Sequence, residues 1–311
     1  MSQKLALVFP GQGSQTVGML ADLHAEFAIV RDTFAESSAA LGYDLWALVA
    51  NGPEADLNET HRTQPALLTA SVAIWRLWQE QSGTTPSYLA GHSLGEYSAL
   101  VCAGVLSLSD AVRLVEKRGQ YMQTAVPAGT GAMSAIIGLD DALIAKACEE
   151  AAQGEVVSPV NFNSPGQVVI AGNKAAVERA NELCKAAGAK RALPLPVSVP
   201  SHCALMKPAA EQLAADLAAM KFGTPSFAVV NNVDVAIAAG EEAIKDALVR
   251  QLYSPVRWTE TIEWLSAQGV TKVVEIGAGK VLNGLVKRIN KDLEVGSVND
   301  LASFKAALAV E

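Results

Sequence analysis

The pentapeptide GHSLG at residues 91–95 constrains the fold of this chain more than any other stretch. A short apolar segment at 87–90 predicts a buried strand before it, and residues 94–101 predict a helix after it. A strand-to-helix turn this tight has no room for side chains beside the serine, and it exposes the hydroxyl at the carboxyl edge of the sheet. The pattern G-x-S-x-G in this context indicates a nucleophilic Ser93; the alternative is a glycine-rich turn with a structural serine.

Size and composition favour a large α/β fold, since half of the 311 residues are hydrophobic and strand-like stretches alternate with helical ones. A net charge of -8 argues against non-specific binding to nucleic acid. The apolar run at 5–9 is too short for a signal peptide, and no stretch reaches transmembrane length. The four cysteines form no CxxC pair or zinc-like cluster. We therefore expect a cytoplasmic protein without metal that binds neither nucleic acid nor membrane.

A glycine-rich turn follows the predicted strand at 5–9. Its glycines are Gly11, Gly13 and Gly18, so the spacing is G-x-G-x4-G and not that of a dinucleotide fingerprint. No acidic residue follows at the end of a second strand at the usual distance. The turn is better interpreted as one that presents backbone N–H groups to another molecule or group.

Helical patterns cover 22–41 and 65–79, the second with Pro65 in its first turn. A third covers 109–122, with Ser107 or Ser109 as its cap. In this helix Arg118 lies on the apolar stripe, and an inward guanidinium needs an anion. A structural salt bridge, or a side chain that snorkels to the surface, is an equally good explanation at this point.

Strand and helix patterns from 132 to 199 follow the order β-α-β-β-α-β, which is typical of a ferredoxin-like unit. The last strand contains prolines, so we expect it at a sheet edge. The predicted fold is α/β, with a mostly parallel sheet core formed by residues 1–126 and 199–311 and a subdomain inserted at 127–198.

A serine at neutral pH needs a base to become a good nucleophile. The chain has four histidines. His24 and His61 lie in polar surroundings and are predicted at the surface, and His92 should point away from the neighbouring hydroxyl. His202 follows a predicted strand end, where catalytic residues of open α/β sheets tend to lie, and it is the favoured base.

Six motifs occur in an order that resembles the malonyl-CoA:acyl carrier protein transacylase family of bacterial fatty acid synthesis. The similarity spans essentially the whole chain and implies a hydrolase-like α/β core with an inserted ferredoxin-like subdomain. The motifs are FPGQGSQ at 9–15, TQPA at 63–66, GHSLGE at 91–96, RG at 118–119, NFNSPGQ at 161–167 and SH at 201–202.

The resemblance implies a role for each matched residue. Ser93 becomes the nucleophile and His202 its general base and acid. The backbone N–H groups of Gln12 and Leu94 become the oxyanion hole, and the residue after the nucleophile is where an elbow places one donor. The histidine is oriented by a backbone carbonyl near Gln251 and not by a carboxylate.

The same resemblance makes Arg118 the anchor for the free carboxylate of malonyl, a bidentate pair that gives both geometry and selection. It also implies substrate contacts for His92, Asn161 and Gln64. The implied reaction transfers malonyl from malonyl-CoA to the phosphopantetheine thiol of acyl carrier protein through a malonyl-serine intermediate. No cofactor is bound in this scheme, the carrier protein is a transient partner, and the enzyme is a monomer.

An acidic carrier protein that docks on an acidic enzyme requires a locally basic surface. We predict this surface at Lys190 and Arg191, on the last strand of the subdomain, and at Lys287, Arg288 and Lys291 on the C-terminal helix. An ordinary solvated helix face is an equally good explanation.

Two other classes of function remain open on the sequence. A serine esterase or thioesterase would use the same elbow but does not need an inward arginine. A non-catalytic subunit that docks the carrier protein would have a Ser93 that never becomes acylated.

Overall fold

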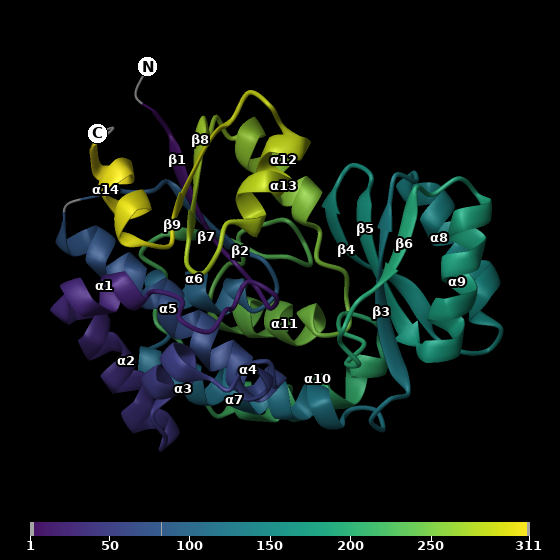
Figure 1. Ribbon diagram of the computed structural model, residues 1–311, viewed down its shortest axis with the longest axis horizontal. Helices are drawn as coiled ribbons and strands as arrows, with labels where there is room; N and C mark the ends of the chain where they lie inside the picture. Colours follow the sequence, from purple (N-terminus) through teal and green to yellow (C-terminus); the bar gives the residue numbers. More distant parts are fainter. Residues whose placement is uncertain (1–2, 82, 310–311) are drawn as a thin grey trace.

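The computed structural model describes residues 3–81 and 83–309. Its larger part is built on a parallel sheet with strand order β7-β2-β1-β8-β9 (Figure 1). The strands are β1 (Leu5–Phe9), β2 (Tyr88–Gly91), β7 (Ala228–Val230), β8 (Lys272–Ile276) and β9 (Glu294–Val298). All five residues of the central strand β1 are buried, which explains its uninterrupted apolar sequence.

Helices cover both faces of this sheet (Figure 1). They are α1 (Ala21–Glu26), α2 (Ala28–Leu41), α3 (Leu45–Asn51), α4 (Glu54–Leu57), α5 (Thr60–Glu80), α6 (Gly95–Cys102), α7 (Leu108–Thr124), α10 (Lys207–Ala218), α11 (Glu241–Gln251), α12 (Trp258–Ala267), α13 (Val281–Ile289) and α14 (Leu301–Ala309).

Alternate residues of β1 point to opposite faces of the sheet and join different parts of the core. Leu5, Leu7 and Phe9 pack with apolar residues of α2, α5, α6 and α7. Ala6 and Val8 pack with residues of α12 and α13. The sheet is therefore buried on both sides, so side chains that could meet a substrate must lie in the loops at the strand ends.

A second, antiparallel sheet has the strand order β4-β5-β3-β6 and lies to one side of the first (Figure 1). Its elements are β3 (Gly131–Ile137), α8 (Asp141–Ala152), β4 (Val157–Ser164), β5 (Gln167–Asn173), α9 (Lys174–Ala186) and β6 (Arg191–Pro194). The α/β fold with a parallel core and an inserted ferredoxin-like unit is confirmed, and the proline-containing strand is at an edge. The sheet lies inside 127–198, while those domain boundaries stay a prediction.

Several local predictions were wrong. Pro65 is not in the first turn of its helix, because α5 begins at Thr60 and the proline lies inside it. The pattern at 22–41 is two helices that break at Phe27, whose backbone is extended. The strand β9 was missed because the side chains of Glu294–Val298 are exposed or half-buried up to the last residue, so the segment has no long apolar run.

None of the helices in residues 3–81 and 83–309 combines the length and apolar content that a membrane crossing requires. Over the same residues, no group of three or more His, Cys, Asp or Glu side chains is arranged to hold a metal ion. The four cysteines are buried and unpaired.

Candidate active site

The GHSLG segment forms a sharp turn between β2, which ends at Gly91, and α6, which begins at Gly95. Ser93 has a φ of 53°, a left-handed conformation that is uncommon for a residue with a side chain. A Cβ on Gly91 would lie 1.8 Å from the carbonyl carbon of Gly95, and one on Gly95 would lie 2.1 Å from the carbonyl oxygen of Phe9. Both glycines are therefore required by close backbone packing, as the motif predicts.

His202 lies directly against the serine hydroxyl. Its Nε2 is 2.7 Å from Ser93 Oγ, and its Nδ1 is 2.7 Å from the backbone carbonyl oxygen of Gln251. A carbonyl oxygen only accepts, so Nδ1 carries the proton of the neutral ring and Nε2 accepts from the hydroxyl. Burial, and then the Arg118 guanidinium, lower the pKa of His202 to about 3. The imidazole is therefore a neutral proton acceptor at neutral pH.

Arg118 of α7 points into the site and is only 1% exposed. Its Nη1 donates to Gln64 Oε1 at 2.7 Å, and its Nη2 donates to Gln251 Oε1 at 2.9 Å. Nη2 also lies 3.4 Å from Ser93 Oγ. No carboxylate of the described residues forms an ion pair with Arg118, so neither a structural salt bridge nor a snorkelling side chain describes it.

The two amides predicted to form an oxyanion hole come from different elements. In residues 3–81 and 83–309, neither the Leu94 N–H nor the Gln12 N–H donates to a protein acceptor. A Cβ on Gly11 would lie 2.5 Å from the carbonyl oxygen of His92, so the glycine-rich turn after β1 touches the elbow. The Gln12 side chain accepts from Thr60 Oγ1 at 3.1 Å. The structure thus brings the turn beside the serine, and the role of the two amides stays a prediction.

Three further residues were predicted to contact substrate, and the structure places each of them in a different part of the site or beside it. Gln64 is buried against Arg118. His92 points away from Ser93, and its Nε2 lies 2.8 Å from Asn163 Oδ1 of the inserted sheet. Asn161 joins that sheet to the core through a bridge to Val256, and no bond connects its side chain with Ser93 or Arg118 within the described residues.

The remaining two histidines lie on other elements. His24 of α1 stacks on Trp46 with ring centroids 3.6 Å apart. His61, near the start of α5, lies beside Glu59. Both side chains are half-buried, where we expected the surface.

Two residues of the site carried no signal that the sequence analysis recognised. Asn232 Oδ1 accepts from the Ser93 N–H at 2.8 Å, and Asn232 Nδ2 donates to the Gly91 carbonyl at 2.7 Å. Glu96, in the first turn of α6, accepts from the Asn232 N–H at 2.9 Å and from Gln251 Nε2 at 2.7 Å. Burial raises the pKa of Glu96 to about 8. Glu96 does belong to the GHSLGE motif, so only its role was missed.

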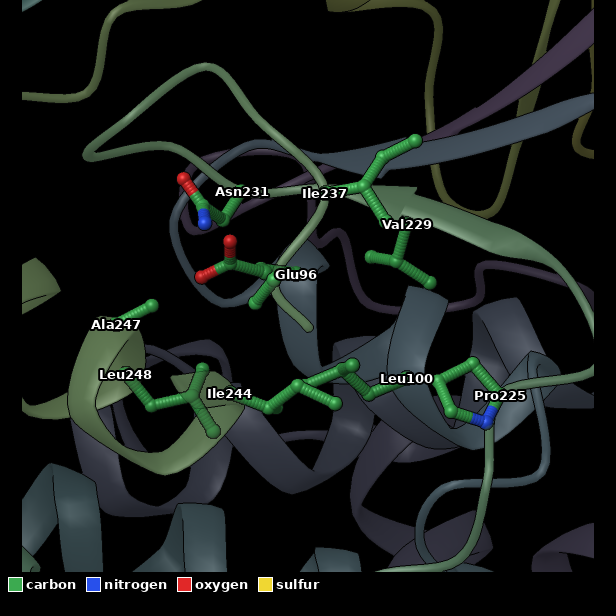
Figure 2. Close-up of a pocket in the computed structure, with 10 residues that line it drawn as sticks. Glu96, Leu100, Pro225, Val229, Asn231, Ile237, Ile244, Ala247 and Leu248 are labelled. Carbon is green, nitrogen blue, oxygen red and sulfur yellow. The ribbon is translucent and has the colours of Figure 1, made fainter. Parts of the chain in front are cut away.

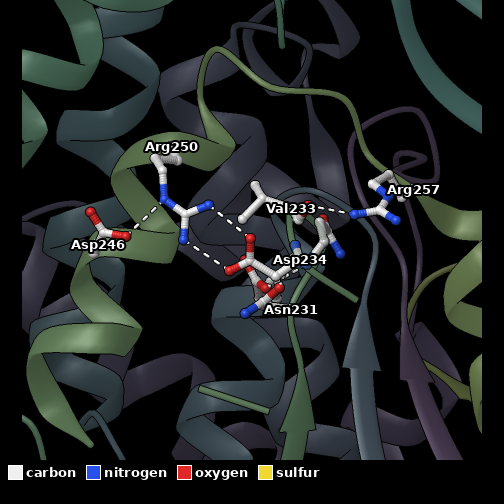
Figure 3. Close-up of polar contacts among 8 residues, drawn as sticks. Asn231, Val233, Asp234, Asp246, Arg250 and Arg257 are labelled. Atoms are coloured by element: carbon white, nitrogen blue, oxygen red, sulfur yellow. Dashed lines mark hydrogen bonds and ion pairs between the residues drawn. The ribbon is translucent and has the colours of Figure 1, made fainter. Parts of the chain in front are cut away.

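The loop that carries Asn232 is itself held by two arginines (Figure 3). Arg250 donates to both carboxylate oxygens of Asp234, at 2.9 and 2.8 Å. Arg257 Nη1 donates to the Val233 carbonyl oxygen at 3.1 Å. Bidentate pairs of this kind fix orientation as well as position. The loop is therefore anchored at the two residues that directly follow Asn232, which binds the Ser93 amide.

The predicted docking residues require one correction. Lys287 and Arg288 lie on α13, which is not the C-terminal helix, because β9 and α14 follow it. Lys291 lies beyond the end of α13. Lys287 Nζ donates to the Leu293 carbonyl at 2.7 Å, so part of its hydrogen-bonding capacity holds the loop between α13 and β9.

Three of the candidate docking side chains meet at one end of the inserted sheet. Arg288 donates to Gln167, the first residue of β5. Gln167 pairs with Ile137 of β3, which pairs in turn with Arg191 of β6. Lys190 adjoins this row, and the side chains of Lys190, Arg191 and Arg288 are exposed. Residues distant in sequence thus form one basic strip.

The comparison with known proteins agrees with this geometry. The acyl transferase domain family matches residues 6–304. The malonyl CoA-acyl carrier protein transacylase of Escherichia coli K12 is 68% identical over 305 residues, covering 98% of this chain and 99% of the relative. The Bacillus subtilis protein of the same name is 46% identical over 98% of this chain and 96% of its own.

Two solved structures extend the comparison. An acyl carrier protein S-malonyltransferase from Vibrio cholerae superposes with a TM-score of 0.96 at 70% identity, covering 98% of this chain and 99% of that one. A malonyl-transacylase in complex with a type II polyketide synthase acyl carrier protein superposes with a TM-score of 0.98 at 66% identity, covering 99% and 100%. The chain therefore belongs to the acyl transferase family and, within it, to the malonyl CoA-acyl carrier protein transacylases.

Proposed function

We propose that this protein transfers malonyl from malonyl-CoA to the phosphopantetheine thiol of acyl carrier protein through an ester on Ser93. The observation that carries the proposal is the continuous arrangement of Ser93 Oγ, the His202 ring and the Gln251 carbonyl, with Arg118 Nη2 3.4 Å from the same Oγ. The reactive groups of one chain already form the site, so the proposed reaction needs no second subunit and we propose a monomer. The buried, unpaired cysteines support a cytoplasmic location, because disulfides are rare there.

In the first half-reaction Ser93 attacks the thioester carbonyl. The Oγ–C bond forms as His202 Nε2 takes the hydroxyl proton, and the oxyanion is stabilised by the Gln12 and Leu94 N–H groups. The C–S bond then breaks, and the coenzyme A sulfur receives the proton from His202. The Gln251 carbonyl stabilises the imidazolium through Nδ1–H.

The second half-reaction reverses these steps with a different thiol. The phosphopantetheine S–H gives its proton to His202 Nε2, the sulfur bonds to the malonyl carbon, and Ser93 Oγ recovers the proton as its ester bond breaks. Coenzyme A and phosphopantetheine act as parts of the two substrates in this scheme. Because His202 is only 3% exposed, bulk water has little access to the base.

Arg118 supplies the preference for a dicarboxylic acyl group. Its present partners on Gln64 and Gln251 are neutral amide oxygens, so its charge has no carboxylate in contact. A malonyl ester on Ser93 would bring its free carboxylate to this guanidinium, where a charge-assisted pair forms away from bulk solvent. An esterase has no need of such a group, and this favours the transferase over the esterase alternative.

Intact-mass spectrometry after brief mixing with malonyl-CoA tests the proposal. We expect a mass increase of one malonyl group that maps to the peptide containing Ser93, and its loss when holo-acyl carrier protein is added. Rapid loss of the group to water alone would identify a thioesterase. A malonyl group on Cys102 or Cys203 would contradict the assignment of the nucleophile.

A further inference from the structure

The side-chain amide of Gln251 has only one orientation that satisfies its surroundings. Its Nε2 lies 2.7 Å from Glu96 Oε2, 3.0 Å from the Ser93 carbonyl oxygen and 3.3 Å from Asn232 Oδ1. Its Oε1 faces Arg118 Nη2 at 2.9 Å. A guanidinium only donates, while the Ser93 carbonyl oxygen, Asn232 Oδ1 and the ionised form of Glu96 on the other side accept. Exchange of the two amide ends would therefore place a donor against Arg118 and an acceptor against Glu96.

Glu96 has few possible partners besides these. The side chain is 2% exposed and lies at the wall of a pocket whose other lining is mostly aliphatic, with Leu100, Ile244 and Leu248 among its residues (Figure 2). The aliphatic groups offer no hydrogen bond. The carboxyl group thus accepts from two fixed donors, the Asn232 N–H at Oε1 and Gln251 Nε2 at Oε2.

We infer that Glu96 is a positioning residue that holds the Gln251 amide with its oxygen toward Arg118, and that it thereby helps select malonyl over acetyl. The inference rests on the proposed function, because it assigns Arg118 to the malonyl carboxylate. Glu96 reaches Arg118 through the Gln251 side chain, while its other oxygen accepts from the backbone of Asn232. The contact from Gln251 to His202 uses the backbone carbonyl, which does not depend on how the side-chain amide is turned.

Glu96→Gln tests the inference with almost no change in shape. Two donors converge on residue 96, and a glutamine offers one oxygen where a glutamate offers two. The Asn232 N–H is part of the backbone and stays in place, so Gln251 Nε2 loses the shortest of its three contacts and holds its oxygen less firmly toward Arg118. We expect the ratio of kcat/KM for malonyl-CoA to that for acetyl-CoA to fall about 10- to 100-fold, the value of one hydrogen bond to a charged group. Acetyl transfer should be unchanged.

A double-mutant cycle separates positioning from general damage. Gln251→Leu removes the amide and keeps the backbone carbonyl, so it should lower the same ratio. If Glu96 acts through Gln251, the double variant loses no more selectivity than Gln251→Leu alone. Additive losses would overturn the inference, and so would an equal fall of malonyl and acetyl transfer in Glu96→Gln.

Glu275→Gln is the matched control. Glu275 is also fully buried and accepts two backbone N–H groups, from Leu282 at 3.2 Å and Asn283 at 3.0 Å, but it makes no contact with Arg118 or Gln251 in the described part of the chain. It should lower the melting temperature without changing the ratio. Glu96→Asp, which keeps both oxygens but retracts them, should shift the ratio in the direction of Glu96→Gln if that variant does not fold. Absence of a malonyl-Ser93 ester in the unaltered protein would instead contradict the proposed function.

Discussion

The two sheets of this molecule contribute very differently to the site. The parallel sheet directs all its strand ends to one edge, where the turns after β1 and β2 meet. In the antiparallel sheet successive strands end at opposite edges, so no comparable set of loops can gather. Among the described residues, its polar contribution to the elbow is one contact, Asn163 to His92. Its inner face packs Met133, Val160 and Val169 around Cys203, the residue after His202.

This difference suggests that the core and the subdomain have separate functions. The core carries the groups that form and break bonds. The subdomain supports the His202 turn and contributes Lys190 and Arg191 to the basic strip, which Arg288 of α13 completes from the core. Changes in the core should affect acylation by malonyl-CoA, while changes at the strip should affect only transfer to the carrier protein.

The largest effect is expected at the base. His202→Ala should slow acylation of Ser93 by roughly two to four orders of magnitude, the usual contribution of a positioned proton acceptor. Single-turnover mixing with malonyl-CoA measures it, and the melting temperature shows whether the fold is intact. His24→Ala, which removes an imidazole from α1, should leave the rate unchanged. A near-normal rate in His202→Ala would shift the role to His92.

Arg118→Ala should lower kcat/KM for malonyl-CoA by roughly two orders of magnitude, since loss of one partner of a desolvated charge pair costs about 2–5 kcal/mol. Acetyl transfer should be unchanged or improved, because an acetyl group offers the guanidinium no carboxylate. Measurement of both substrates on one variant separates selection from damage. A parallel fall for the two substrates would mean that Arg118 only supports the fold.

The lowered pKa of His202 gives a pH prediction. With a pKa of about 3 the imidazole stays neutral, and therefore competent, from pH 7.5 down to pH 5.5. A histidine with the ordinary pKa near 6.5 would lose about tenfold of its neutral form at pH 5.5. Acylation rates should therefore be flat over this range. The unfolded chain binds a proton below pH 6.5 that the folded one does not, so stability should fall as the pH drops from 6.5 toward 3.

The smallest effect on acylation is expected at the basic strip. Arg191→Glu combined with Arg288→Glu should raise KM for acyl carrier protein several-fold, more at low salt than at high salt, and leave acylation by malonyl-CoA intact. Lys185→Glu, on the exposed face of α9, is the matched charge reversal outside the strip. Equal damage to both half-reactions would remove the distinction between the two regions.

Much of the site could be predicted from sequence because its signals are local. Gly91 is required by contacts within the turn and Gly95 by the Phe9 carbonyl of the neighbouring strand β1, and both belong to one short motif. The 3.6-residue periodicity of α7 is enough to direct Arg118 inward. Pro65 shows the limit of such reasoning. A proline is expected in the first turn of a helix. Here most of α5 is buried, and this tertiary packing stabilises the additional helical turn from Thr60 that precedes Pro65.

By itself the sequence determined the elbow, the inward arginine, the order of strands and helices in the inserted sheet and, through its motifs, the family. Only the tertiary structure decided which polar groups from distant segments contact the elbow and the inserted sheet. Asn232 and Gln251 reach Ser93 from 139 and 158 positions away, and Arg288 meets Gln167 across 121. Periodicity reports which side of an element a residue faces, but it carries no information on what an unrelated segment places there. Buried polar groups must find partners, and in this molecule the partners come from wherever the fold brings them.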